Sequence, residues 1–285
     1  MTAASYSAGT SLPVRSIRAN NFASESENRI HADDVAAQYG FKGGLVPGVG
    51  VLAYMTQPVV EALGREWLER GRISARFIQP VYHDETVTAL ATVVGETPLS
   101  LKLEVRNSDG ETCAVGEAEL SERRPEVPDP ADYPQAPMPP AAERFPPRIS
   151  VLQAGETIMG TLHCDLSWQT PLEGPDAFID AVCDPLPIYR GEAACCHPAL
   201  ISAYANRLLK DNVNLGPWIH TASAIQFFSL PNEGDPVSLR GKVAKTFEKR
   251  GHEFVALDLV MFDAGEQPLA HIVHSAIIHP AQRQA

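Results

Sequence analysis

The sequence has no apolar run that approaches the roughly 20 residues of a membrane-spanning helix. Its N-terminus, MTAASYSAGTSLPVRS, also lacks the basic start and the continuous apolar stretch of a secretory signal. These two absences predict a protein of the cytoplasm that has no membrane partner.

Positive charge is scarce as well, with 23 Lys and Arg residues against 35 Asp and Glu residues and a formal net charge of −12. A surface of this sign repels the phosphate backbone of nucleic acids and the headgroups of anionic lipids. We therefore expect no nucleic-acid partner, and we expect a small-molecule substrate instead.

The few cysteines show no spacing typical of a metal site, and a bridge between two adjacent ones would be strained. They are Cys113, Cys164, Cys183, Cys195 and Cys196. The histidines do not cluster with cysteines or acids at ligand spacing, and no glycine-rich phosphate loop occurs. We expect reduced thiols, no metal and no cofactor.

A length of 285 residues favours two domains, since one domain typically has roughly 100 to 200 residues. Residues 122–148 contain so many prolines that neither a helix interior nor a central strand can form there. This segment is predicted to be an extended, semi-rigid linker. It divides the chain into an N-terminal unit, residues 1–121, and a C-terminal unit, residues 149–285.

The two units are predicted to be copies of one another. Ala53-Tyr54 corresponds to Ala203-Tyr204 and Phe77 to Phe227, all at one common spacing along the chain. A shared spacing over such a length indicates an internal repeat.

Each copy contains one apolar helix followed by β-rich runs. The predicted helices are residues 49–63 and 199–209; the predicted strands are 73–78, 86–94, 99–106 and 112–120, then 222–230, 237–246, 253–262 and 269–278. This order predicts an α+β fold of two tandem units, each an antiparallel sheet wrapped around one apolar helix. Pro58 lies inside the first helix and should kink or shorten it.

A polar loop that ends in Asn28-x-x-His31 precedes the helix start Val46-Pro47-Gly48. This loop, the helix start and the strands that follow resemble MaoC-like (R)-specific enoyl-thioester hydratases and dehydratases. The resemblance covers most of both units and implies two hot dog units in a double hot dog arrangement. It also implies a lyase that adds water to an enoyl-CoA or removes it from a 3-hydroxyacyl-CoA.

The resemblance assigns His31 as the general base, because imidazole accepts protons near neutral pH. It assigns the Gly48 amide, at a helix N-terminus, to the developing negative charge on the thioester oxygen. Asn28 would orient water or hold the loop. Ser26 stands where the family has its catalytic Asp, and the neighbouring Glu25 or Glu27 could supply the acid if the loop backbone differs.

Contacts to the substrate are expected from the helix start and from the second unit. The predicted residues are Phe41, Pro47, Val49, Tyr54, Tyr189 and His197. Tyr189 lies about where His31 would be in the second copy, and a phenol with a pKa of about 10 is a poor base. The second site is therefore predicted to be degenerate, with a cavity that accommodates a bulky acyl group.

Two other functions fit the same residues. One is an acyl-CoA thioesterase, and the other is a non-catalytic protein that binds an acyl thioester or another hydrophobic ligand. If the substrate is a CoA thioester, Lys42, Arg72 and Arg76 are candidate phosphate contacts. Two fused units reproduce the dimer on which a hot dog site depends, so the chain is expected to act as a monomer or a homodimer.

Overall fold

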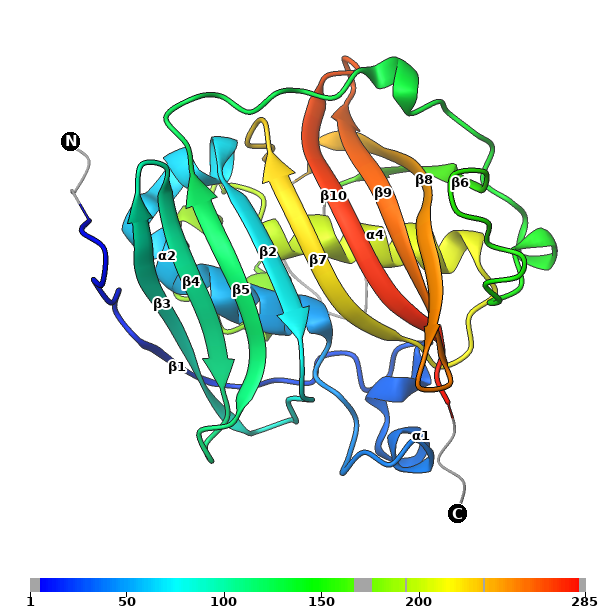
Figure 1. The fold of residues 1–285 in the computed structure, drawn as a ribbon, viewed down its shortest axis with the longest axis horizontal. Coiled ribbons are helices and arrows are strands. Elements are labelled where there is room, and N and C mark those ends of the chain that lie inside the picture. The colour runs from blue at the N-terminus through cyan, green and yellow to red at the C-terminus, as the bar shows by residue number, and fades with distance from the viewer. Residues whose placement is uncertain (1–5, 167–175, 193, 233, 282–285) are drawn as a thin grey trace.

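A computed structural model describes residues 6–166, 176–192, 194–232 and 234–281. Its strands form one antiparallel sheet in the order β1-β3-β4-β5-β2-β7-β10-β9-β8-β6 (Figure 1). The first unit contributes β1 (Arg15–Arg18), β2 (Arg72–Phe77), β3 (Thr86–Glu96), β4 (Leu99–Arg106) and β5 (Thr112–Leu120). The second contributes β6 (Ile158–Asp165), β7 (Ile219–Phe227), β8 (Pro236–Lys249), β9 (His252–Asp263) and β10 (Pro268–His279).

The sheet order confirms the internal repeat, because each half lists its strands in the mirrored sequence of the other. The halves meet where β2 pairs with β7, from Arg72 opposite Gln226 to Arg76 opposite Ala222. The eight predicted strands all form, with ends within a few residues of the predicted ones. Only the two edge strands, β1 and β6, were not predicted.

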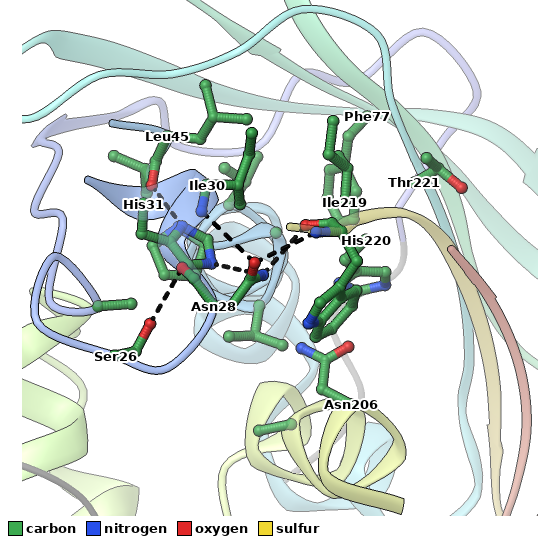
Figure 2. A pocket seen from close by; sticks show the side chains of 18 of the residues that line it. Ser26, Asn28, Ile30, His31, Leu45, Phe77, Asn206, Ile219, His220 and Thr221 are labelled. Carbon is green, nitrogen blue, oxygen red and sulfur yellow. Dashed lines mark hydrogen bonds between the residues drawn. The ribbon is translucent and has the colours of Figure 1, made fainter. Parts of the chain in front are cut away.

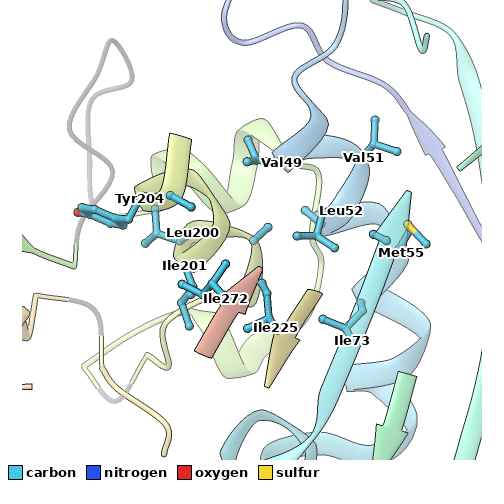
Figure 3. Packing of buried hydrophobic residues seen from close by; sticks show 14 of the residues in the cluster. Val49, Val51, Leu52, Met55, Ile73, Leu200, Ile201, Tyr204, Ile225 and Ile272 are labelled. Carbon is cyan, nitrogen blue, oxygen red and sulfur yellow. The ribbon is translucent and has the colours of Figure 1, made fainter. Parts of the chain in front are cut away.

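Two long helices, α2 (Gly48–Arg70) and α4 (Pro198–Asn212), lie side by side on one face of the sheet (Figure 1). Between them and the sheet lies one continuous apolar core, where Leu52 of α2 and Ile201 of α4 pack near Ile225 of β7 (Figure 3). The remaining helical segments are short: α1 (Asp33–Gln38), α3 (Ala177–Ala181), and the 3-10 turns Arg29–His31, Pro130–Asp132, Ala141–Glu143 and Pro187–Tyr189. The predicted α+β architecture is confirmed.

The expectation that Pro58 would kink or shorten α2 is wrong about the position. The helix continues through Pro58, and its kink lies at Gly64, with φ 60° and ψ −146°. The residues from Val49 to Val60 are all buried, so the apolar area they remove from water offsets the backbone hydrogen bond lost at proline.

The proline-rich segment 122–148 is bound to the sheet rather than being a plain extended spacer. Ala136 exchanges backbone and side-chain hydrogen bonds with Thr161 on β6, at 2.8 and 3.0 Å. The hydroxyl of Tyr133 donates to the Asp258 carboxylate on β9 at 3.0 Å. Within the described residues, no helix is long and apolar enough to cross a membrane.

Candidate functional site

A cavity of about 780 Å³ lies between the two units. Its walls come from the loop before α1, the N-terminus of α2, the end of β2, one side of α4, and the start of β7. Figure 2 shows Asn28 between His31 from the first unit and His220 from the second. The sequence-predicted loop is therefore one wall of the cavity, and the second unit supplies the opposite wall.

Asn28 joins the two units through its amide group. Its Oδ1 accepts a hydrogen bond from the Trp218 amide at 3.2 Å, and its Nδ2 donates to the Trp218 carbonyl at 3.0 Å. The Oδ1 atom also caps the 3-10 turn that carries His31, by accepting from the Ile30 amide. Asn28 thus fixes the position of His31 relative to the start of β7.

The tautomer of His31 follows from its partners. Nδ1 lies 2.7 Å from the Leu45 carbonyl oxygen, which can only accept, so Nδ1 carries the proton in the neutral ring. Nε2 then carries the lone pair and accepts a long, 3.4 Å hydrogen bond from Asn28 Nδ2 beside the cavity. Burial lowers the pKa of His31 despite the opposing Leu45 hydrogen bond, and this keeps the ring neutral at pH 7, so that Nε2 can accept a proton.

The backbone around His31 is held closely. Asn21 Nδ2 donates to the His31 carbonyl at 2.8 Å. A Cβ on Gly44 would lie 1.9 Å from the same carbonyl oxygen, so only glycine fits at that position. Asp33 accepts from the Gly44 amide at 2.7 Å and closes the loop.

Gly48 is the first residue of α2, after Pro47 as the N-cap. Within the described residues, its amide has no hydrogen-bond acceptor, as is usual for the first turn of a helix. A Cβ at this position would come 2.8 Å from His220 Nδ1 and 3.0 Å from the Phe77 ring. The absence of a side chain therefore lets the second unit approach the helix start.

None of the acids near the missing Asp position bonds to His31. Ser26 Oγ makes a long, 3.4 Å contact to the Asn28 carbonyl. Glu27 forms an ion pair with Lys210 of α4 at 3.0 Å, and that hydrogen bond lowers the pKa of its carboxyl group. Glu25 lines the cavity mouth and is exposed.

The predicted substrate contacts divide into two groups. Phe41, Pro47 and Val49 line the cavity, as do the predicted loop residues. Tyr54, Tyr189 and His197 do not line it. Tyr54 is buried against β1, where its hydroxyl oxygen accepts from the Asn20 amide at 3.1 Å, and burial raises its pKa to about 12.

In the second unit, the equivalent of this site is closed. His197 Nε2 lies 3.2 Å from the Asp184 carboxylate, and both side chains are almost fully buried. His197 Nδ1 accepts from the Ala199 amide and so caps α4, while its ring packs 4.5 Å from that of Tyr189. These residues pack within the second unit and do not line the cavity, so their contact with substrate stays a prediction.

The candidate phosphate contacts lie elsewhere, since Lys42, Arg72 and Arg76 do not line the cavity. Arg72 borders a separate depression of about 200 Å³ at the junction of the two units. Among the residues that the structure describes, no group of three or more His, Cys, Asp or Glu side chains could hold a metal ion.

The cavity residues contributed by the second unit were not predicted from the sequence, and Asn206, Trp218 and His220 are among them. No local motif marks them, and they reach the cavity only because β2 pairs with β7 and α4 lies beside α2. Nothing in the sequence indicates that the Trp218 backbone binds Asn28.

Comparisons with known proteins agree with the fold. Residues 2–114 match the family model described as MaoC like domain. A search of curated proteins found no match.

Among solved structures, the chain is similar to a conserved hypothetical protein from Mycobacterium tuberculosis described as having a double hotdog fold. The TM-score is 0.63 at 15% identity, covering 95% of this chain and 96% of the other. A chain from Chloroflexus aurantiacus that has been assigned as a MaoC domain protein dehydratase has a TM-score of 0.60 at 11% identity, covering 98% of this chain and 97% of the other. A chain from Lactobacillus plantarum that has been assigned as an oleoyl thioesterase has a TM-score of 0.52 at 12% identity, covering 96% of this chain and 98% of the other. The predicted double hot dog fold is confirmed.

Proposed function

From a double hot dog fold whose first unit matches the MaoC-like domain, we propose that this chain adds water to an enoyl thioester or removes it from a 3-hydroxyacyl thioester. The observation that carries the proposal is the His31 ring, whose Nδ1 is bound to the Leu45 carbonyl and whose Nε2 lone pair lies beside the cavity at the start of α2. A neutral imidazole next to unpaired helix amides is suited to both proton transfer and carbonyl polarisation.

In the hydration direction, His31 Nε2 takes a proton from water as the water oxygen bonds to C3 of the substrate. The electron pair of the C2–C3 double bond moves to the thioester oxygen, where the Gly48 amide stabilises the negative charge. The protonated His31 then returns its proton to C2. Because one group both takes and returns the proton, this route needs no carboxylate at the Ser26 position.

The cavity also bears on the substrate class. Its volume of about 780 Å³ falls within the range of pockets that enclose drug-sized ligands. Asn206, Trp218 and Ile219 of the second unit line it together with the loop of the first. The proposed substrate is a CoA thioester whose acyl group extends between the units, bound by one chain or by each chain of a homodimer in the cytoplasm.

Hydrolysis of the thioester is the alternative reaction. One observation is compatible with it, as it is with the one-base hydration: within the described residues, no carboxylate bonds to His31. Hydrolysis requires a base that activates water and a polarised carbonyl, but it requires no protonation at carbon.

One assay separates these reactions. The purified chain is incubated with a panel of enoyl-CoA thioesters, and two signals are followed: the ultraviolet absorbance of the conjugated thioester and the release of free thiol. Loss of absorbance without thiol release, abolished in His31→Gln, is the expected result. Thiol release would establish hydrolysis instead. Thermal stabilisation by the thioesters without either signal would indicate a binding protein and would refute both reactions.

A further inference from the structure

The smaller depression, of about 200 Å³, lies at the junction of the two units. Its walls come from the end of α2, the start of β2, the ends of β5 and β7, and the first residues of the proline-rich segment. Arginine is the commonest residue that lines it: Arg70, Arg72, Arg123 and Arg124. In a chain with a formal net charge of −12, such a concentration of positive charge calls for a physical reason.

The depression is separate from the cavity beside His31. Helix α2 begins with Gly48 at the cavity and ends with Arg70 at the depression, and a helix of this length spans about 30 Å. Strand β2 likewise begins with Arg72 at the depression and ends with Phe77 at the cavity (Figure 1). Among the described residues, none lines both. A ligand in the depression would therefore be bound apart from a ligand in the cavity.

Most arginines of this protein form ion pairs, but three of those in the depression do not. Arg70 pairs with Glu66, one turn earlier on α2. Arginines elsewhere in the chain are paired in the same way. Arg72, Arg123 and Arg124 have no carboxylate within ion-pair distance in the part of the chain that the structure describes. Their charges are available to a ligand.

The acids near the depression do not balance these charges. Of the described residues that line it, only Glu119 is acidic. Glu119 lies opposite Arg72 in the pairing of β5 with β2, yet their side chains form no ion pair. Glu122 precedes Arg123 in the chain and does not line the depression. Like charges gathered in one place repel one another, and a bound anion would remove this repulsion.

The arginines differ in how they can reach a ligand. Arg72, Arg123 and Arg124 are exposed, so their guanidinium groups are accessible from the depression. Arg70 is partly buried, and its Nη1 atom is inaccessible to solvent, so Arg70 forms part of the wall and is not a contact. Gln226 Nε2 donates to the Arg70 carbonyl at 3.1 Å and holds the end of α2 against β7.

Both the chemistry and the size of the depression indicate a phosphate group. Guanidinium binds phosphate through two parallel N–H···O bonds, so several arginines around one small space match a polyanion. The volume is below the roughly 300 Å³ at which pockets begin to enclose drug-sized ligands, which excludes a whole nucleotide or CoA molecule. We propose that the depression binds a small phosphate-bearing anion of about the size of pyrophosphate through Arg72, Arg123 and Arg124, independently of the occupant of the cavity.

Isothermal titration of the full chain with inorganic pyrophosphate at constant ionic strength tests the proposal. We expect one site per chain, with affinity about tenfold weaker or less in Arg72→Gln and in Arg124→Gln, because each variant loses charge-assisted hydrogen bonds. The matched control is Arg76→Gln. Arg76 is exposed on the same strand and has no ion-pair partner among the described residues, but it does not line the depression. Its substitution should change the affinity by less than about twofold, because salt screens a charge at that distance.

Two results of this titration would overturn the proposal. One is the absence of binding heat for the wild-type chain at millimolar pyrophosphate. The other is an equal loss of affinity in Arg76→Gln and Arg72→Gln, which would indicate attraction to positive charge in general. Thermal unfolding checks that the variants are folded, and their melting temperatures should match the wild type because the substituted side chains are exposed.

A titration in the presence of CoA distinguishes a free anion from the phosphates of a CoA molecule. If the ligand is a free anion, saturating CoA should leave the affinity for pyrophosphate unchanged. Competition by CoA would overturn the independent site, because the arginines would then bind the phosphates of CoA. None of these measurements requires turnover, so their outcome is separate from that of the hydration reaction.

Discussion

The two units place polar side chains at equivalent backbone positions, yet they use them differently. In the first unit, His31 ends a 3-10 turn and keeps an imidazole lone pair beside the cavity. In the second, Tyr189 ends the matching turn and is fully buried, while His197 at the next helix start is bound to Asp184. The buried His197–Asp184 pair stabilises the fold, although the Tyr189 hydroxyl has no partner among the described residues, whereas a polar group beside a cavity can bind a ligand.

The largest effect is expected for a substitution of His31, which lies at the cavity of the first unit. His31→Gln removes the base, so kcat/KM for the enoyl-CoA panel should fall about 10²- to 10⁴-fold, with little change in the free energy of unfolding. The control is His163→Gln, on the exposed face of β6, which should have wild-type kinetics. Equal activity of His31→Gln and wild type would show that His31 is not the catalytic base.

The buried His197–Asp184 pair of the second unit is tested by Asp184→Ala. Removing the carboxylate leaves the His197 ring and the Leu186 amide without their buried partner, so the free energy of unfolding should fall by about 3 kcal/mol. The control, Asp180→Ala, breaks a largely exposed ion pair with Arg190 and should cost less than about 1 kcal/mol. Urea denaturation measures both. A large loss of activity in folded Asp184→Ala would show that the second unit is not merely structural.

The link between the units is tested by Asn28→Ala. Loss of the two hydrogen bonds to the Trp218 backbone should lower the free energy of unfolding by about 2 kcal/mol and lower kcat roughly tenfold, because His31 loses its fixed position. Asn107→Ala is the matched control, since that side chain also accepts from two backbone amides, but in an exposed turn. Its kcat should be unchanged, and a matching fall would indicate a global effect.

Acid should destabilise the fold through its buried histidines. Burial lowers the pKa values of His31, His220 and His274, and that of His274 reaches about 3. The unfolded chain binds protons below its own histidine pKa of about 6.5, whereas the folded chain does not, so stability is present above pH 6.5 and is lost as pH falls toward 3. His274 should contribute about 1.4 kcal/mol per pH unit in that window, and His31 and His220 should add to the loss in the same direction.

Urea denaturation at several pH values checks this slope. The variant His274→Leu should have a shallower dependence than wild type, because one neutral buried imidazole has been removed. An unchanged slope in that variant would mean that His274 is protonated in the folded state.

The smallest effect is expected for Glu27→Gln. Its carboxylate is in an exposed ion pair with Lys210, so stability should change by less than about 1 kcal/mol and kcat by less than about threefold. The same result is expected for Glu25→Gln. If either variant instead lost about two orders of magnitude in turnover rate, that glutamate would be the acid that replaces the missing Asp, in contradiction to the one-base route.

The sequence was sufficient for the repeated architecture, because its signals are local and strong. The apolar runs of α2 and α4, the alternating strands and the proline-rich segment each have a period or composition that short-range physics fixes. The course of α2 through Pro58 was not predictable, since burial of residues 49–60 outweighs a local penalty. The edge strands β1 and β6 were missed because they are short or carry little alternation.

For the site, the sequence determined which loop carries His31, Asn28 and Gly48, since these residues lie within one stretch of chain. Only the tertiary structure decided that Asn28 binds the Trp218 backbone, that His197 is bound to Asp184, and that His220 lies against Gly48. The reason is physical: these contacts join residues far apart in the chain, and they form only when β2 pairs with β7 and brings the two units together.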